Sequence, residues 1–329
     1  MTPRRLREAP GEAPRAPARE RKVVVWGAIA ANVAIAVAKF VAAALTGSSA
    51  MLSEGIHSVV DCGNEGLLLL GQRRSHQPAD ELHPFGHGME LYFWGLVVAI
   101  ALFGLGGGMS FYEGARHLRH PQPLTSATAA YAVLAIAAVA EGTSWTIAMR
   151  ELERGRRPGQ GFWAAIRASK DPSTFVVLLE DTAALAGIAV AAAGLFAAHA
   201  FHAPLLDGVA SIGIGAVLTA VAFFLAHECR KLLVGESAHP DVVAAIRGAM
   251  QRRPAVREVR RVLTLQLAPD QVLVNADVRF DPEIAAAELA AEIRALERDV
   301  RAADASVRRV FIEAVDGDGG SAADPHATA

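Results

Sequence analysis

The chain has few of the residues that mark several common protein classes. Only two of its 329 residues are cysteines, Cys62 and Cys229, which excludes a disulfide framework and a cysteine-rich metal cluster. Aromatic residues make up 6% and charged residues 20%, and the net charge of −2 gives no reason to expect a nucleic-acid partner. The remaining composition, with 52% hydrophobic residues and a mean hydropathy of +0.29, favours a polytopic membrane protein over a soluble enzyme.

Six apolar runs are each long enough to cross a bilayer, which needs about 20 mostly apolar residues. They cover residues 23–45, 50–72, 91–113, 126–149, 174–198 and 206–228. We therefore expect a six-helix transmembrane domain over residues 23–232, preceded by a disordered basic arm over residues 1–22. The first run is too long for a signal-peptide core and is interpreted as a retained span. In the third run, Gly104 and Gly108 have a spacing typical of close helix packing.

Basic residues are concentrated in alternate loops of this predicted topology. They lie in the N-terminal arm, in the second and fourth loops and after the last span, whereas the opposite loops hold only Arg116 and Arg119. Cytoplasmic loops carry the excess of Lys and Arg, so the pattern predicts that both termini face the cytoplasm. Since no organelle-targeting pattern is convincing, the inner membrane of a bacterial cell is the simplest location.

From about Pro240 the sequence changes to the pattern of a soluble domain. A short amphipathic helix precedes two alternating stretches, "VRRVLTLQL" and "QVLVNADVRF", which form a predicted hairpin. A second helix and a third strand, "VRRVFIEAV", follow. The order α-β-β-α-β indicates a small cytoplasmic α+β domain over residues 238–316, and residues 317–329 form a predicted disordered tail.

Ionisable residues lie inside two of the apolar runs. His57, Asp61 and Asn64 share one face of the second span at i, i+4 and i+7, and the fifth span carries Glu180 and Asp181. Imidazole and carboxylate groups are ligands for Zn²⁺, Mn²⁺ and Fe²⁺, and a bound cation offsets carboxylate charge at low dielectric. A proton relay or a buried hydrogen-bonded pair without a metal explains the same residues.

The loop after the second span contains a second cluster of ligand-type residues. The stretch "PADELHPFGHGME" places Asp80, His83 and His87 within eight residues, and the two histidines have a spacing that suits one helical turn. Alone, such a loop is more often an ordinary solvated turn. Beside the intramembrane residues it indicates a second cation site.

Other polar residues in the spans have weaker interpretations. Lys39 and Glu141 form a candidate structural ion pair, with a proton-linked acid at Glu141 as the alternative. Glu54 lies one turn before His57 and is a candidate partner for it. Asp207 lies near a span end, where interfacial water is expected to solvate it.

The order of these features resembles the cation diffusion facilitators, a family of proton-coupled exporters of divalent metals. The resemblance rests on "ANVAIAVAKF", "LTGSSAMLSEGIHSVVD" and "HPFGHG", together with six spans and a cytoplasmic α-β-β-α-β domain. Three further stretches, "SKDPSTFVVLLEDTAALAG", "GGGMSFYEG" and "EGTSW", are similar to the zinc transporter nine-like branch.

The resemblance implies roles for individual residues. It makes His57, Asp61 and Asp181 the ligands of the transport site, and it makes the loop residues Asp80, His83 and His87 an auxiliary metal site. It also implies a homodimer with a metallochaperone-like dimerisation domain at the C-terminus. The chain departs from the family at Val177, where His or Asp is usual, so Asn64, Glu180 or a water molecule is a candidate to complete the transport site.

We therefore expect proton-coupled efflux of Zn²⁺ by alternating access, with Mn²⁺, Fe²⁺, Co²⁺ and Ni²⁺ as other possible cargoes and no prosthetic group. We do not expect an enzyme. The first alternative is an intramembrane metal-dependent hydrolase that activates water with the same residues, although no separate nucleophile or general-base motif accompanies them. The second is a non-transporting metal sensor or scaffold with the same fold, which the missing ligand at Val177 keeps open.

Overall fold

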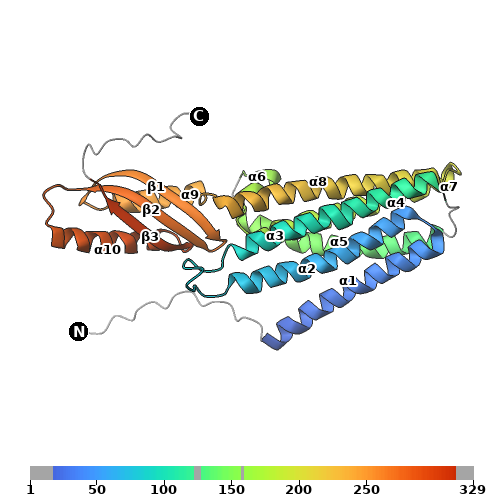
Figure 1. Ribbon diagram of the computed structural model, residues 1–329, viewed down its shortest axis with the longest axis horizontal. Helices are drawn as coiled ribbons and strands as arrows, with labels where there is room; N and C mark the ends of the chain where they lie inside the picture. The colour runs from blue at the N-terminus through green and yellow to red at the C-terminus, as the bar shows by residue number, and fades with distance from the viewer. Residues whose placement is uncertain (1–17, 122–126, 157–158, 316–329) are drawn as a thin grey trace.

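The computed structural model of the protein describes residues 18–121, 127–156 and 159–315. These residues form an elongated helical bundle with a small sheet and two helices beyond one of its ends (Figure 1). The helical segments of the bundle are α1 (Ala18–Thr46), α2 (Ser49–Ser75), α3 (Glu90–Ala101), η1 (Leu102–Gly107), α4 (Gly108–Arg119), α5 (Ala127–Gly155), α6 (Phe162–Ala168), α7 (Pro172–Ala200) and α8 (Leu205–Gly235). Residues 1–17 of the predicted N-terminal arm and the whole predicted tail lie outside the described residues.

Local sequence explains where two of the functionally important helices begin. Ser48 is the N-cap of α2, and its hydroxyl accepts a hydrogen bond from the Met51 amide (3.1 Å). Asp171 is the N-cap of α7, and its carboxylate accepts a hydrogen bond from the Ser173 amide (2.9 Å). Pro172 follows in the first turn of α7, where its missing N–H has no helical partner to lose.

The third apolar run is not one regular α-helix. Between α3 and α4, residues Leu102–Gly107 form the π-helical segment η1, which changes the rotation of the chain about the helix axis. The prediction that Gly104 and Gly108 pack closely against another helix is therefore wrong. Gly107 and Gly114 face α8 instead, where an added Cβ would lie 2.5 Å from Thr219 Oγ1 and 2.8 Å from Gly208 O, respectively.

Four helical segments among the described residues are long and apolar enough to cross a membrane. They are Glu90–Arg119, Thr128–Arg154, Pro172–Ala200 and the stretch Leu205–Gln251, whose long apolar helix is α8 (Leu205–Gly235). The shorter stretch Asn32–Thr46 of α1 is apolar as well. The helix α2 is less apolar because it carries His57, Asp61 and other polar residues along its length. The described chain is thus mostly helical, and four of the six predicted spans are identified by length and composition.

The C-terminal region has the predicted order of elements. It consists of α9 (Pro240–Gln251), β1 (Val256–Ala268), β2 (Gln271–Phe280), α10 (Ala286–Ala303) and β3 (Val307–Ala314). The strands β1 and β2 form the expected antiparallel hairpin, and β3 pairs with β2 in parallel, giving the order β1-β2-β3. Alternate residues of β2, such as Val274 and Val278, are buried with Ile246 of α9 and Leu296 of α10.

The loop between α2 and α3 lies against this C-terminal sheet (Figure 1). Arg309 of β3 donates a hydrogen bond to the carbonyl oxygen of Pro84 (2.9 Å), and its guanidinium carbon lies 5.3 Å from the centre of the Phe85 ring. Gly88 lies so close to β1 that an added Cβ would be 2.6 Å from the carbonyl oxygen of Leu267. The loop that carries Asp80, His83 and His87 is therefore held between the bundle and the sheet.

Candidate functional site

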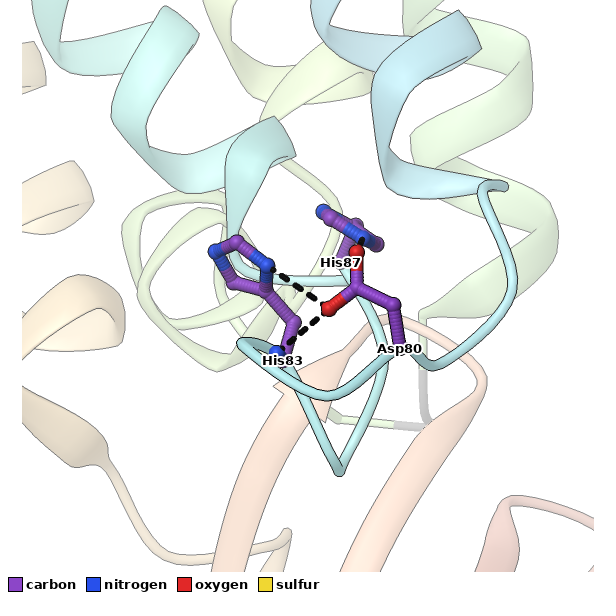
Figure 2. A group of neighbouring side chains, drawn as sticks. All are labelled: Asp80, His83 and His87. Carbon is purple, nitrogen blue, oxygen red and sulfur yellow. Dashed lines mark hydrogen bonds and ion pairs between the residues drawn. The ribbon is translucent and has the colours of Figure 1, made fainter.

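The loop residues Asp80, His83 and His87 form one compact cluster (Figure 2). The Nδ1 atom of His83 lies 3.2 Å from Asp80 Oδ1, and Nε2 of His87 lies 3.1 Å from Asp80 Oδ2. One potential ligand atom from each residue lies within 4.8 Å of the others, and these are the only three His, Cys, Asp or Glu residues of the described chain that meet this criterion. Two imidazoles and one carboxylate are a donor set that Zn²⁺ accepts, with a fourth position left for water.

The electrostatics of the loop favour an ionised carboxylate at its centre. The backbone amide of His83 donates a hydrogen bond to Asp80 Oδ1 (2.6 Å), and this bond, helped by the two imidazoles, holds the pKa of Asp80 below its usual range. The side chains of Asp80 and His83 are about half exposed, whereas that of His87 is 9% exposed. The cluster is therefore open to solvent on one side, as exchange of a bound ion requires.

His57 and Asp61 lie together in the interior of the bundle. His57 is completely buried, and its Nδ1 atom is 3.3 Å from Asp61 Oδ1, although the two atoms make no hydrogen bond. The Nε2 atom of His57 also has no hydrogen-bond partner. Four residues apart on α2, these side chains share the helix face that their spacing predicts.

A small cavity of about 50 Å³ extends from Asp61 to α7. Its acidic lining residues are Asp61, Glu65, Glu141, Glu180 and Asp181, and its other lining residues are Asn32, Ile35, Ser58, Ala140, Ser144 and Val177. The volume is sufficient for a dehydrated cation or a few water molecules. Asp61 and Asp181 therefore face a common space, whereas His57 is not one of the lining residues. Sequence reasoning gave Glu141 no ligand role and interpreted it as a structural partner of Lys39 or as a proton-linked acid.

Two of the cavity carboxylates have a hydrogen-bond donor within the protein. Asn64 donates from Nδ2 to Glu180 Oε1 (2.6 Å), and Asn32 donates from Nδ2 to Glu65 Oε1 (2.6 Å). Asn64 and Glu180, which the sequence offered as separate candidates to complete the transport site, are thus bound to each other. Asp181 interacts with Ser144 of α5, but its Oδ2 atom is buried without a hydrogen-bond partner.

The interpretation of Lys39 and Glu54 changes with the structure. The Nζ atom of Lys39 lies 3.0 Å from Glu54 Oε2 and donates a second hydrogen bond to Ser58 Oγ (2.8 Å). Lys39 is therefore paired with Glu54 and not with Glu141, and Glu54 is not the partner of His57. The sequence could not assign these pairs, because several acids lie on helix faces within reach of a lysine side chain.

Asp207 is a structural residue that the sequence did not indicate. It is completely buried, contrary to the expectation of interfacial solvation. Its carboxylate accepts hydrogen bonds from the hydroxyl of Ser48 (2.6 Å) and from the amide of Ser49 (2.5 Å) at the first turn of α2. These hydrogen bonds connect the first turn of α8 to the first turn of α2, the helix that carries His57 and Asp61.

Comparison with known protein families identifies the helical bundle. Residues 25–234 match the family model described as the cation efflux transmembrane domain. The chain belongs to the cation efflux family. This is the cation diffusion facilitator family that the sequence motifs resemble, and it is a family of transporters and not of enzymes, as predicted.

The relatives in this family support the zinc transporter nine-like branch. The human protein named proton-coupled zinc antiporter SLC30A9, mitochondrial, is 38% identical over 262 residues, which are 79% of this chain and 46% of the relative. Metal tolerance protein C4 of Arabidopsis thaliana is 29% identical over 238 residues, covering 72% of this chain and 52% of the relative. Magnetosome protein MamB of Paramagnetospirillum magneticum is 23% identical over 264 residues, covering 80% and 83%.

The chain spans about half the length of the zinc antiporters it matches. The match to the cation efflux transmembrane domain begins within α1 and ends at the end of α8. Family membership and the apolar helices together make the chain an integral membrane protein.

Proposed function

We propose that the protein exports Zn²⁺ in exchange for protons. The observation that carries this proposal is a group of buried ligand atoms inside the bundle that make no hydrogen bond. It comprises both ring nitrogens of His57, Oδ1 of Asp61 and Oδ2 of Asp181. Buried polar atoms are costly when they have no partner, and a divalent cation is a partner that suits imidazole and carboxylate together. Relatives in the family are named proton-coupled zinc antiporters, which supports zinc as the cargo and the proton as the counter-ion.

His57, Asp61 and Asp181 are the proposed ligands of the transported ion. Their ligand atoms are not all within 4.8 Å of one another, whereas the ligands of one Zn²⁺ ion lie about 2 Å from it and hence within about 4 Å of each other. Cation binding would therefore draw α2 and α7 together. Asn64 and Glu180 would each have to give up their shared hydrogen bond before either could join the ion.

The proposed transport cycle uses the difference in proton concentration between the two sides of the membrane. All six long helical segments, α1, α2, α3–α4, α5, α7 and α8, cross the membrane, and both termini face the cytoplasm of a bacterial cell. Neutral His57 and ionised carboxylates bind the cation from the cytoplasm. After a rocking motion, protons from the more acidic side compete for the same ligands and release it.

The domain organisation and assembly are part of the proposal. Residues 23–232 form the transporter domain, and residues 238–316 form a cytoplasmic dimerisation domain of a homodimer. The described residues of the second region include a sheet with its own buried cluster, which agrees with a separate domain.

The test is zinc flux in liposomes that contain the purified full-length chain and carry a pH gradient. We expect zinc uptake that dissipates the gradient, and loss of at least nine-tenths of the initial rate in Asp61→Ala. Asp299→Ala is the matched control, because this carboxylate lies on α10 outside the bundle and is expected to leave flux unchanged. A panel of Mn²⁺, Fe²⁺, Co²⁺ and Ni²⁺ ranks the other cargoes.

The same preparation separates the alternatives. Equal flux from Asp61→Ala and the parent chain would remove the proposed transport site. Metal-dependent hydrolysis of a substrate without flux would favour the hydrolase, and metal binding without flux or hydrolysis would favour the sensor or scaffold.

A further inference from the structure

The transport site lacks one of the usual ligand positions of its family on α7. Val177 lies four residues before Asp181, so the two side chains are one turn apart on the same face of the helix. Both line the 50 Å³ cavity, and Val177 therefore contributes an apolar wall where a ligand would be expected. A further protein ligand beside Asp181 therefore has to come from another helix.

The helix α5 is placed to supply this ligand. Trp145 of α5 donates a hydrogen bond from Nε1 to Thr182 Oγ1 (3.0 Å), next to Asp181 on α7. Glu141 lies one turn before Trp145, and its side chain lines the same cavity as Asp61 and Asp181. It is also close enough to both aspartates to interact with them electrostatically.

Glu141 is the cavity glutamate without a hydrogen bond from a described side chain, although it lies within electrostatic reach of Lys39. Glu65 is held by Asn32 and Glu180 by Asn64. Lys39, the expected partner of Glu141, is bound to Glu54 and Ser58. No described residue donates a hydrogen bond to Glu141, and its carboxylate is therefore available.

A second observation points to a cation or a proton in this cavity. Asp181 is 8% exposed, and its Oδ2 atom is buried without a hydrogen-bond partner. A buried carboxylate oxygen without a donor is unfavourable unless a cation or a proton occupies the neighbouring space. The cavity next to this atom is the one that Glu141 lines.

We propose that Glu141 of α5 is a ligand of the transported cation and replaces the ligand that Val177 cannot provide. This inference rests on the proposed function, because it adds a residue to the same transport site. The site then takes ligands from α2, α5 and α7 instead of from α2 and α7 alone. Its chemistry has one imidazole and three carboxylates, which suits Zn²⁺ and harder cations such as Mn²⁺.

The test measures initial zinc flux against zinc concentration in liposomes with the full-length chain. For Glu141→Gln we expect the zinc concentration at half-maximal rate to rise by about tenfold or more, since even loss of a residue that only orients a metal ligand weakens affinity by about 10–100-fold. Adding Val177→Asp to Glu141→Gln is expected to recover most of the loss, because it returns a carboxylate to the same cavity. Glu151→Gln is the matched control on the same helix and is expected to stay within about twofold of the parent chain, because its exposed carboxylate pairs with Arg154 and does not line the cavity.

The outcomes separate this inference from the proposed function. If the parent chain gives no zinc flux, the proposed function itself fails. If the parent chain transports and Glu141→Gln has an unchanged half-maximal concentration, Glu141 is not a ligand. A variant that keeps this concentration but no longer responds to the pH gradient assigns Glu141 to proton binding and also overturns the inference. Equal elution of all variants on size exclusion excludes misfolding as the cause, and rescue by Val177→Asp cannot arise from a purely structural role.

Discussion

Lys39 and Glu54 form an ion pair of 3.0 Å in which neither side chain is exposed to solvent. The pair connects α1 to α2 three residues before His57, and Gly187 of α7 makes room for it, because an added Cβ there would overlap Glu54 Oε1. Removing one partner of a buried pair leaves an uncompensated charge. The packing of three helices around the transport site therefore depends on both members being present.

Replacing Lys39 alone is expected to destabilise the bundle strongly. For Lys39→Met we expect a loss of about 3 to 5 kcal/mol in unfolding free energy, because Glu54 stays buried without its cation. The double variant Lys39→Met, Glu54→Gln is expected to recover most of this loss. Thermal unfolding in detergent measures both, and a single variant as stable as the parent chain would contradict the structural role of the pair.

Asp207 is expected to be important for the start of α2. Asp207→Ala removes the acceptor for Ser48, Ser49 and Ala50, so we expect a loss of about 2 to 4 kcal/mol in unfolding free energy. Asp207→Asn keeps one acceptor oxygen and is expected to lose roughly half as much. The comparison requires only thermal unfolding of the three proteins, and equal stability of the two variants would show that the number of acceptors is irrelevant.

The loop cluster is expected to bind zinc independently of the transport site. We expect His83→Ala, His87→Ala to lose one equivalent of bound Zn²⁺ per chain, measured by equilibrium dialysis, while zinc flux continues at a reduced rate. Binding at this cluster should weaken as the pH falls, because protons compete with the metal for its ligands. Complete loss of flux in the double variant would instead make the loop part of the transport pathway.

Glu236 provides a test of pH-dependent stability outside the membrane-spanning segments. Burial opposes its ionisation, but Lys170 (2.9 Å) and Lys231 (3.4 Å) outweigh this effect and hold the pKa of Glu236 below its usual value. Because the folded pKa is lowered, this stabilisation is complete above the usual carboxyl pKa and is lost as the pH falls through the lowered one.

Lys170→Met is the variant that reports this effect. We expect it to unfold at a lower temperature than the parent chain at pH 7, by an amount that corresponds to at most about 1 kcal/mol, because the pair is partly exposed. The difference should shrink as the pH falls below about 4. A difference that stays constant over this range would assign the effect of Lys170 to packing and not to its charge.

Periodicity allowed much of this fold to be predicted, and the reasons are local. The alternating pattern of "QVLVNADVRF" identified β2 because one face of the strand is buried, and the four-residue spacing of His57 and Asp61 identified a shared face of α2. The spacing in the loop likewise brought Asp80, His83 and His87 to attention before their distances were known.

The pairing of polar groups between distant segments could not be predicted in this way. Asp207 accepts a hydrogen bond from Ser49, which is 158 residues away in the sequence. Lys39 forms its ion pair with Glu54 and not with Glu141 because of the way α1 packs against α2. The π-helical segment at Leu102–Gly107 also has no signature in the hydrophobic pattern. Gly104 and Gly108 were predicted to pack closely, whereas Gly107 and Gly114 do so. Such features depend on tertiary packing and not on the local sequence.

The contact of Gly88 with Leu267 has a mechanical consequence for this protein. The carbonyl oxygen of Leu267 occupies the place where a side chain would start, and Gly88 lies immediately before the first turn of α3. A tilt of α3 is therefore expected to move the hairpin of β1 and β2 as well. The angle between the C-terminal sheet and the bundle then reports the tilt of α3. The distance between spectroscopic labels on β1 and α5 measures this angle.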